Sequence, residues 1–211
     1  MELVTRRSFL KQSFVLVALA SAGRFMAACV GAAALPFITM GLNLIGTILP
    51  TIPSIIAAIS SLTGHTISAA SVAKLTQVLS GVQDLFSQAQ SALIAYQQNA
   101  DPTLIAKIQD LLGQVKTRMQ AILTDVQITD QATVAKILSI ANSFIDLANN
   151  ILVILPSVAN GKVQAKRVSK AQLAQVSSNA WAAKFNAAVK VKTSNPEVEK
   201  AFANVVAVPK N

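Results

Sequence analysis

The stretch that decides the fold is residues 133–155, which read TVAKILSIANSFIDLANNILVIL. Its main apolar row advances in alternating steps of three and four residues: Val134, Ile137, Ala141, Phe144, Ala148, Ile151 and Leu155. This spacing places the row on one face of an α-helix. Two more rows widen that face: Leu138, Ile145 and Leu152, and Ile140, Leu147 and Ile154. We therefore predict an amphipathic helix that several neighbours enclose.

Two stretches in which apolar residues have the same spacing precede residues 133–155. The first has apolar residues at Leu75, Val78, Val82, Leu85, Ala89, Ala92 and Tyr96, and the second at Ile105, Ile108, Leu112, Val115, Met119, Ile122 and Val126. The short connections hold Asp101-Pro102 and Thr129-Asp130, which are typical helix starts. Loops of about four residues place neighbouring helices antiparallel. The sequence predicts an all-α protein, an antiparallel up-down helical bundle.

An apolar segment precedes these helices at residues 35–62. Pro50 and Pro53 divide it, so we predict helices at about 37–49 and 53–62. The segment is expected to pack on the wide face of the 133–155 helix. The mean hydropathy of the whole chain, +0.52, also allows a membrane location. In that alternative, the 24 uncharged residues 26–49 are long enough to span a bilayer.

The chain becomes basic after the three long helices. Residues 161–211 carry a net charge of +7, whereas residues 62–160 carry −1. Residues 161–167 are interpreted as a basic linker, and Ser169 with Gln172 as a capping box that opens a helix. A last short helix is expected to follow Asn195-Pro196. This tail is predicted to dock on the bundle through its aromatic side chains: Trp181, Phe185 and Phe202.

The amino terminus carries an export motif. The residues Thr5-Arg6-Arg7-Ser8-Phe9-Leu10-Lys11 precede the apolar stretch 14–20, and Arg24 closes that stretch. This pattern resembles the twin-arginine signal of exported bacterial proteins, in which Arg6, Arg7, Phe9, Leu10 and Lys11 are the residues that match the motif. The resemblance implies recognition by the twin-arginine translocase and a location in the periplasm or cell envelope.

The single cysteine of the chain follows small residues in Met26-Ala27-Ala28-Cys29. This sequence is similar to the processing box of bacterial lipoproteins, with methionine where leucine is usual. The resemblance implies cleavage before Cys29 and lipidation of its thiol, which would hold the protein on a membrane. Two alternatives stay open: cleavage after Ala34, and an uncleaved segment 26–49 that spans the bilayer.

The composition supplies little catalytic chemistry. One histidine and one cysteine provide no ligand set for a typical zinc, copper or haem site. Asp84 and Asp146 could face each other as an acid–base pair, but both also fit as single polar positions on amphipathic helices. His65 is interpreted as a solvated or locally hydrogen-bonded turn residue. There is no glycine-rich nucleotide motif, so we expect no enzymatic activity, no cofactor and no metal.

The basic segment is the remaining candidate for contact with a binding partner. Its members are Lys162, Lys166, Arg167 and Lys170. No aromatic residues that could stack on bases lie between them, so nucleic acid is not the expected partner. Anionic lipids or envelope polymers fit better. No pattern in the sequence identifies a protein partner.

These observations divide the chain into four parts. Residues 1–28 form the signal peptide, and residues 29–64 the apolar segment, on the bundle or in the membrane. Residues 65–158 form the three-helix core, and residues 159–211 the basic linker with the C-terminal helices. The function predicted from these parts is that of an exported, lipid-anchored helical bundle with a structural or protein-interaction role. The alternative is a helical protein that binds an apolar ligand or inserts into a membrane.

Overall fold

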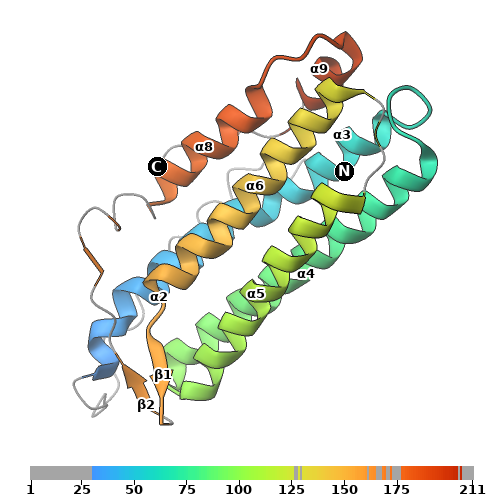
Figure 1. Cartoon of the computed structure of the whole chain (residues 1–211). Helices are drawn as coiled ribbons and strands as arrows, with labels where there is room; N and C mark the ends of the chain where they lie inside the picture. The colour runs from blue at the N-terminus through green and yellow to red at the C-terminus, as the bar shows by residue number, and fades with distance from the viewer. Residues whose placement is uncertain are drawn as a thin grey trace, which may run out of the picture.

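A computed structural model of the chain describes residues 30–125, 128, 130–160, 162–164, 168–169, 172, 177–203 and 205. Figure 1 shows long helices lying side by side, with one small sheet at the end of the bundle. In order, the elements are α2 (Val30–Ile48), η1 (Leu49–Thr51), α3 (Ile52–Ser61), α4 (Ala69–Gln98), α5 (Pro102–Asp125), α6 (Gln131–Ile154), β1 (Ser157–Ala159), β2 (Lys162–Gln164), α8 (Ser178–Lys190) and α9 (Pro196–Ala203). The predicted all-α class is confirmed.

Side-chain caps fix the starts of the long helices. The Ser68 hydroxyl accepts a hydrogen bond from the Ser71 N–H at 3.2 Å, at the start of α4. The Asp101 carboxylate accepts one from Thr103 N–H at 2.9 Å, and Asp130 accepts one from the N–H of Thr133, also at 2.9 Å. Each bond satisfies a backbone donor that has no partner inside the helix. The predicted roles of Asp101 and Asp130 as helix caps are confirmed.

The apolar rows read from the sequence form the core. Along α4 the buried members are Leu75, Val82, Leu85, Ala89, Ala92 and Tyr96, while Val78 is half-buried. Along α6 two rows are buried, one through Phe144 and one through Leu147, except for Val134, which is half-buried. The third row is also half-buried: Leu138, Ile145 and Leu152. The wide apolar face predicted for this helix is therefore confirmed. It is covered by α2, α5 and α8.

The apolar segment 35–62 lies along the bundle as α2, η1 and α3. α2 packs against α4 and α6, and α3 packs against α4 and α9. The buried residues of the segment are Ile38, Leu44, Ile45, Ile48, Ile52, Ile55, Ala58, Ile59 and Leu62. Pro50 and Pro53 are exposed and mark the bend between the two helices, as predicted. The first helix begins at Val30, earlier than the expected residue 37, and continues through Pro36. Pro36 is exposed, so water can satisfy the carbonyl group that its ring leaves unbonded.

The C-terminal helices dock on the bundle through buried aromatic rings. Trp181 and Phe185 are fully buried, and their rings stack with centroids 5.1 Å apart. The Trp181 indole N–H donates to the backbone carbonyl of Ser143 at 2.8 Å. Phe202 of α9 is 2% exposed. The predicted docking of the tail is confirmed, because no large aromatic side chain of α8 or α9 is left in water.

The predicted capping box also forms. Ser169 N–H donates to Gln172 Oε1 at 2.9 Å, and Gln172 N–H donates to Ser169 Oγ at 3.2 Å. The two bonds satisfy backbone donors reciprocally. Leu173 and Val176, which belong to the helix expected after this box, lie outside the described residues. The described part of the next helix, α8, begins at Ser178 with Ser177 as its cap.

Candidate functional site

Of the residues predicted to form an export, lipidation or anionic-contact site, the structure describes only Lys162. The export signal lies outside the described residues, and so does the lipidation site: Arg6, Arg7, Phe9, Leu10, Lys11 and Cys29. Three residues of the basic segment also lie outside the described residues: Lys166, Arg167 and Lys170. The fourth member, Lys162, is exposed and is the first residue of β2. Val30, the residue after Cys29, is the first residue of α2.

Lys162 is held in a β-hairpin, which was not predicted from the sequence. β1 and β2 pair antiparallel, with Val158 opposite Val163 and Ala159 opposite Lys162. Asn160 has a φ of +52° at the connection. The interpretation of residues 161–167 as a linker is therefore wrong for residues 162–164. The missed signal is Asn160-Gly161, because both residues tolerate the positive φ that a two-residue hairpin turn requires.

The hairpin and the start of α2 lie at the same end of the bundle, which we call the hairpin end (Figure 1). β2 contacts α2, and β1 contacts α5. Gln109 of α5 donates a hydrogen bond from Nε2 to the backbone carbonyl of Pro156 at 3.3 Å. Gln97 Nε2 at the end of α4 donates to Thr39 Oγ1 of α2, also at 3.3 Å. The structure therefore brings Lys162 close to the helix that directly follows Cys29.

A buried lysine ties the C-terminal segment to the opposite end. Lys136 of α6 is 1% exposed. Its Nζ donates to the carbonyl of Val191 at 2.8 Å and to Glu199 Oε1 at 3.3 Å, and it lies 5.4 Å from the centroid of the Phe202 ring. Burying a charge is costly unless partners surround it. All of these partners come from residues 191–202, so α9 and the loop before it compensate the charge of α6.

The carboxylate of Glu199 accepts hydrogen bonds from several donors. Besides Lys136, it accepts hydrogen bonds from the backbone N–H of Thr193 at 2.7 Å and from Thr193 Oγ1 at 3.1 Å. The Thr193 N–H is the main cause that lowers the pKa of Glu199 below its ordinary value, and Lys136 adds to this effect. Both interactions favour the ionised carboxylate. Glu199 therefore closes the loop between α8 and α9 as well as neutralising the lysine.

The lowered pKa of Glu199 predicts a loss of stability in acid. The stabilisation is complete above the unfolded glutamate pKa of 4.5 and decreases as the pH falls through the lower pKa of the folded state. We expect Glu199→Gln to remove this part of the pH dependence of the free energy of unfolding, measured by urea denaturation between pH 3 and pH 7, about the range over which carboxylates titrate. Glu197→Gln, in the same helix turn, is the matched control. If the pH dependence of the free energy of unfolding is unchanged in Glu199→Gln, Glu199 is not the group that causes it.

A contact between two polar side chains joins α9 to the turn after α3. His65 follows Gly64, whose φ of +79° allows the turn, and His65 Nδ1 lies 3.3 Å from Glu197 Oε2. The two side chains are 59% and 55% exposed, so the pair adds little to stability. They border a groove of about 540 Å³, lined by Ser54, Ala57, Ala58, Ser61, Leu62, His65, Glu197, Lys200 and Ala201. The two serine hydroxyls in the groove, of Ser54 and Ser61, donate to the backbone carbonyls of Thr51 and Ala58 rather than to the histidine.

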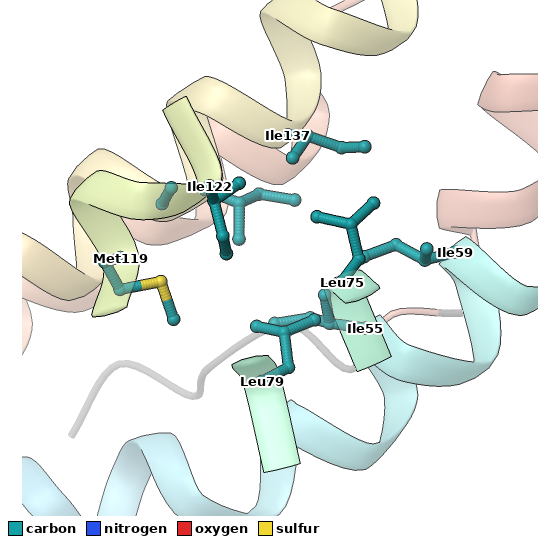
Figure 2. A pocket seen from close by; sticks show the side chains of 9 residues that line it. Ile55, Ile59, Leu75, Leu79, Met119, Ile122 and Ile137 are labelled. Carbon is teal, nitrogen blue, oxygen red and sulfur yellow. The ribbon is translucent and has the colours of Figure 1, made fainter. Parts of the chain in front are cut away.

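A small apolar cavity lies between α3, α4, α5 and α6. Figure 2 shows side chains from these helices converging on it, among them Ile55, Leu75, Leu79, Met119 and Ile137. Its volume is about 10 Å³. A space of that size accommodates at most about one water molecule, and the apolar wall offers that water no hydrogen bonds. The cavity as it stands cannot hold an apolar ligand of ordinary size.

The described residues contain no cluster of three or more side chains that could hold a metal ion. Asp146 of α6 lies 3.3 Å from Lys184 Nζ of α8, and Asp84 of α4 is exposed. The hydroxyl of Tyr96 is buried and without a hydrogen-bond partner in the structure, and burial raises its pKa. A buried neutral phenol with no base beside it is not a nucleophile.

Two stretches of helix are long and apolar enough to cross a membrane. They are Leu35–Ser61, with a mean hydropathy of 1.8, and Thr133–Ile154, with a mean hydropathy of 1.6. Buried core helices of soluble proteins have the same length and composition, and about half of each stretch is buried in this fold: 44% and 50%. The two helices are compatible with a membrane location without requiring one.

No known protein family, curated protein or solved structure matches this chain.

Proposed function

We propose that this protein is an exported, lipid-anchored helical bundle of the bacterial envelope, with a structural or protein-interaction role. The observation that carries the proposal is the burial of the apolar face of α2 and α3 against α4 and α6. A segment that is folded into the bundle in this way is not free to span a bilayer. Attachment to a membrane then needs a separate device, and the chain offers one at Cys29, directly before α2.

Leaving the bundle would be costly for this segment. Ile38, Leu44 and Ile45 are fully buried, and each contributes roughly 1.5–3 kcal/mol relative to exposure. The facing rows of α4 and α6, including Leu93 and Ile151, would lose their cover at the same time. A lipid on Cys29 avoids this cost because two acyl chains hold a protein durably without any spanning helix.

The export signal fits the same fold. The twin-arginine route carries proteins that fold before export, and a bundle in which successive helices pack on each other folds fast because its contacts are local. The basic segment supports a location at an anionic surface: Lys162 is exposed, and Lys166, Arg167 and Lys170 follow within eight residues. These residues are the proposed contact with anionic lipid or envelope polymer.

The proposal is tested by Cys29→Ala. We expect the variant either to be released from membranes into the periplasm or to accumulate as an unprocessed precursor, measured by cell fractionation. Mass spectrometry of the wild-type amino terminus is expected to find a diacylglyceryl cysteine at position 29. Met26→Leu, which restores the usual lipoprotein box, is the matched control and should stay processed and membrane-bound.

The opposite result has a clear meaning. If Cys29→Ala has the same size as the wild-type protein, stays in the membrane and resists extraction with alkali, residues 26–49 span the bilayer and the lipid anchor is wrong. The burial of α2 and α3 described above would then have to be given up in the membrane-bound protein.

A further inference from the structure

The outward face of α3 carries no charged side chain. Between Arg24 and Lys74 the sequence contains no aspartate, glutamate, lysine or arginine. The hydroxyl groups of Ser54 and Ser61 donate to backbone carbonyls three residues earlier, at 2.7 and 2.8 Å. Charged residues are depleted in the cores of protein interfaces, and small side chains let two helices approach closely. The exposed residues of α3 are small or compact: Pro53, Ala57, Ser60 and Ser61.

α9 forms the second wall of the groove beside this face. Figure 1 shows α9 next to α3, and the two helices are in contact. The side chains of Glu197 and Lys200 both line the groove, and they lie about one helical turn apart on the same face of α9. Lys200 is exposed, and no carboxylate of the described residues forms an ion pair with it. The groove therefore presents one negative and one positive group to a molecule that enters it.

This charge pattern is complementary to itself. Across a two-fold axis, residue i of one copy contacts residue j of the other, and j contacts i. Two antiparallel α9 helices therefore place Glu197 of each copy beside Lys200 of the other, whereas a parallel pair would place like charges together. His65 contacts Oε2 of Glu197, and Oε1 has no hydrogen-bond partner among the described residues, so it is available to a second lysine. The same arrangement seats each α9 over the groove of the other copy.

A hollow of the same volume on α5 lacks these features. It also measures about 540 Å³, but every residue that lines it belongs to α5, so it has no second wall. Its charged groups are engaged within the protein. Asp110 accepts a hydrogen bond from Gln114 Nε2 at 2.8 Å, and the guanidinium group of Arg118 occupies the space that a Cβ at Gly81 of α4 would need. The groove between α3 and α9 is therefore the better fit for another helix.

We infer that two copies of this chain associate through the groove between α3 and α9, with their α9 helices antiparallel. The inference rests on the proposed function, because it names a second copy as the partner in the protein-interaction role. The groove lies at the end of the bundle opposite the hairpin and the start of α2 (Figure 1). A lipid on Cys29 therefore leaves this surface accessible to a neighbouring copy on the same membrane.

The test reverses each charge and then mixes the two variants. Glu197→Lys has two positive groups on this face of α9, and Lys200→Glu has two negative groups. Each variant alone is expected to associate about tenfold more weakly than the wild type, because like charges then meet across the two-fold axis. An equimolar mixture should associate as the wild type does, because both contacts of the mixed dimer join opposite charges. The measurement is sedimentation equilibrium of the mature protein in detergent of matched density.

A second pair of variants tests the α3 wall. Ala57→Leu places a larger side chain in the groove, so we expect mostly monomer at the concentration at which half of the wild-type protein is dimeric. Ala106→Leu is the matched control, because it makes the same exchange at an exposed position of α5. This control should dimerise as the wild type does. A dimer of unchanged strength in Ala57→Leu would overturn the assignment of the interface to the groove.

The outcomes separate this inference from the lipid anchor. Wild-type protein that stays monomeric at every concentration overturns the dimer, and so does a mixture of the two charge-reversed variants that stays monomeric while both have the helical circular dichroism of the wild type. Monomeric protein that fractionates with membranes leaves the anchor standing. Protein that dimerises as described but is recovered from cells without membrane attachment supports the dimer and contradicts the anchor.

Discussion

Phe144→Ala is expected to lower the free energy of unfolding by about 3–5 kcal/mol. The Phe144 side chain is fully buried, and its ring centroid lies 6.3 Å from those of both Phe86 and Phe185. It therefore joins α4, α6 and α8, and its removal leaves a void that rigid helices close only in part. The measurement is the midpoint of urea denaturation at neutral pH.

Asp84→Asn is the control for this prediction. Asp84 is exposed on α4, and surface substitutions change stability by less than about 0.5 kcal/mol. A larger loss in Asp84→Asn than in Phe144→Ala would contradict the packing described here and would point to a functional aspartate instead.

Changing Arg6 and Arg7 together to lysine is expected to abolish export. The substitution keeps both positive charges, so a loss of export would show that the planar guanidinium groups are required and not only the charge. We expect the precursor to accumulate in the cytoplasm, measured by immunoblotting of cell fractions. Arg24→Lys, the same exchange outside the motif, should be exported normally. Periplasmic accumulation of the double variant at the wild-type level would exclude the twin-arginine assignment.

The core could be predicted from the sequence because apolar spacing reports directly which residues share a helix face. The row from Leu75 to Tyr96 and two of the three rows of residues 133–155 are mostly buried, as expected, and the third row is half-buried. Capping residues such as Asp101 and Asp130 are local signals, so they located the helix starts well. The up-down order of the helices stays a prediction. The proposed export and lipidation residues rest on their motifs alone, because they lie outside the described residues.

The hairpin and the buried lysine were harder to foresee for different reasons. Asn160-Gly161 is a hairpin signal, but only three residues on each side pair, so the alternation that identifies a strand is too short to see. Lys136 falls between apolar positions of α6 and looks like a solvent-facing lysine. Its burial depends on Val191 and Glu199, which lie 55 and 63 residues later in the chain. No local pattern reports such a distant partner.

The position of Lys136 has a consequence for synthesis on the ribosome. Helices α2 to α6 are complete in the nascent chain at Ile154, yet the partners of this ammonium group are not made until residues 191–199. Until then the lysine must remain hydrated, which keeps water at one end of the α6 face. The segment 191–202, which is translated later, therefore excludes water from this end of the bundle, and a chain truncated before Val191 lacks the groups that do so.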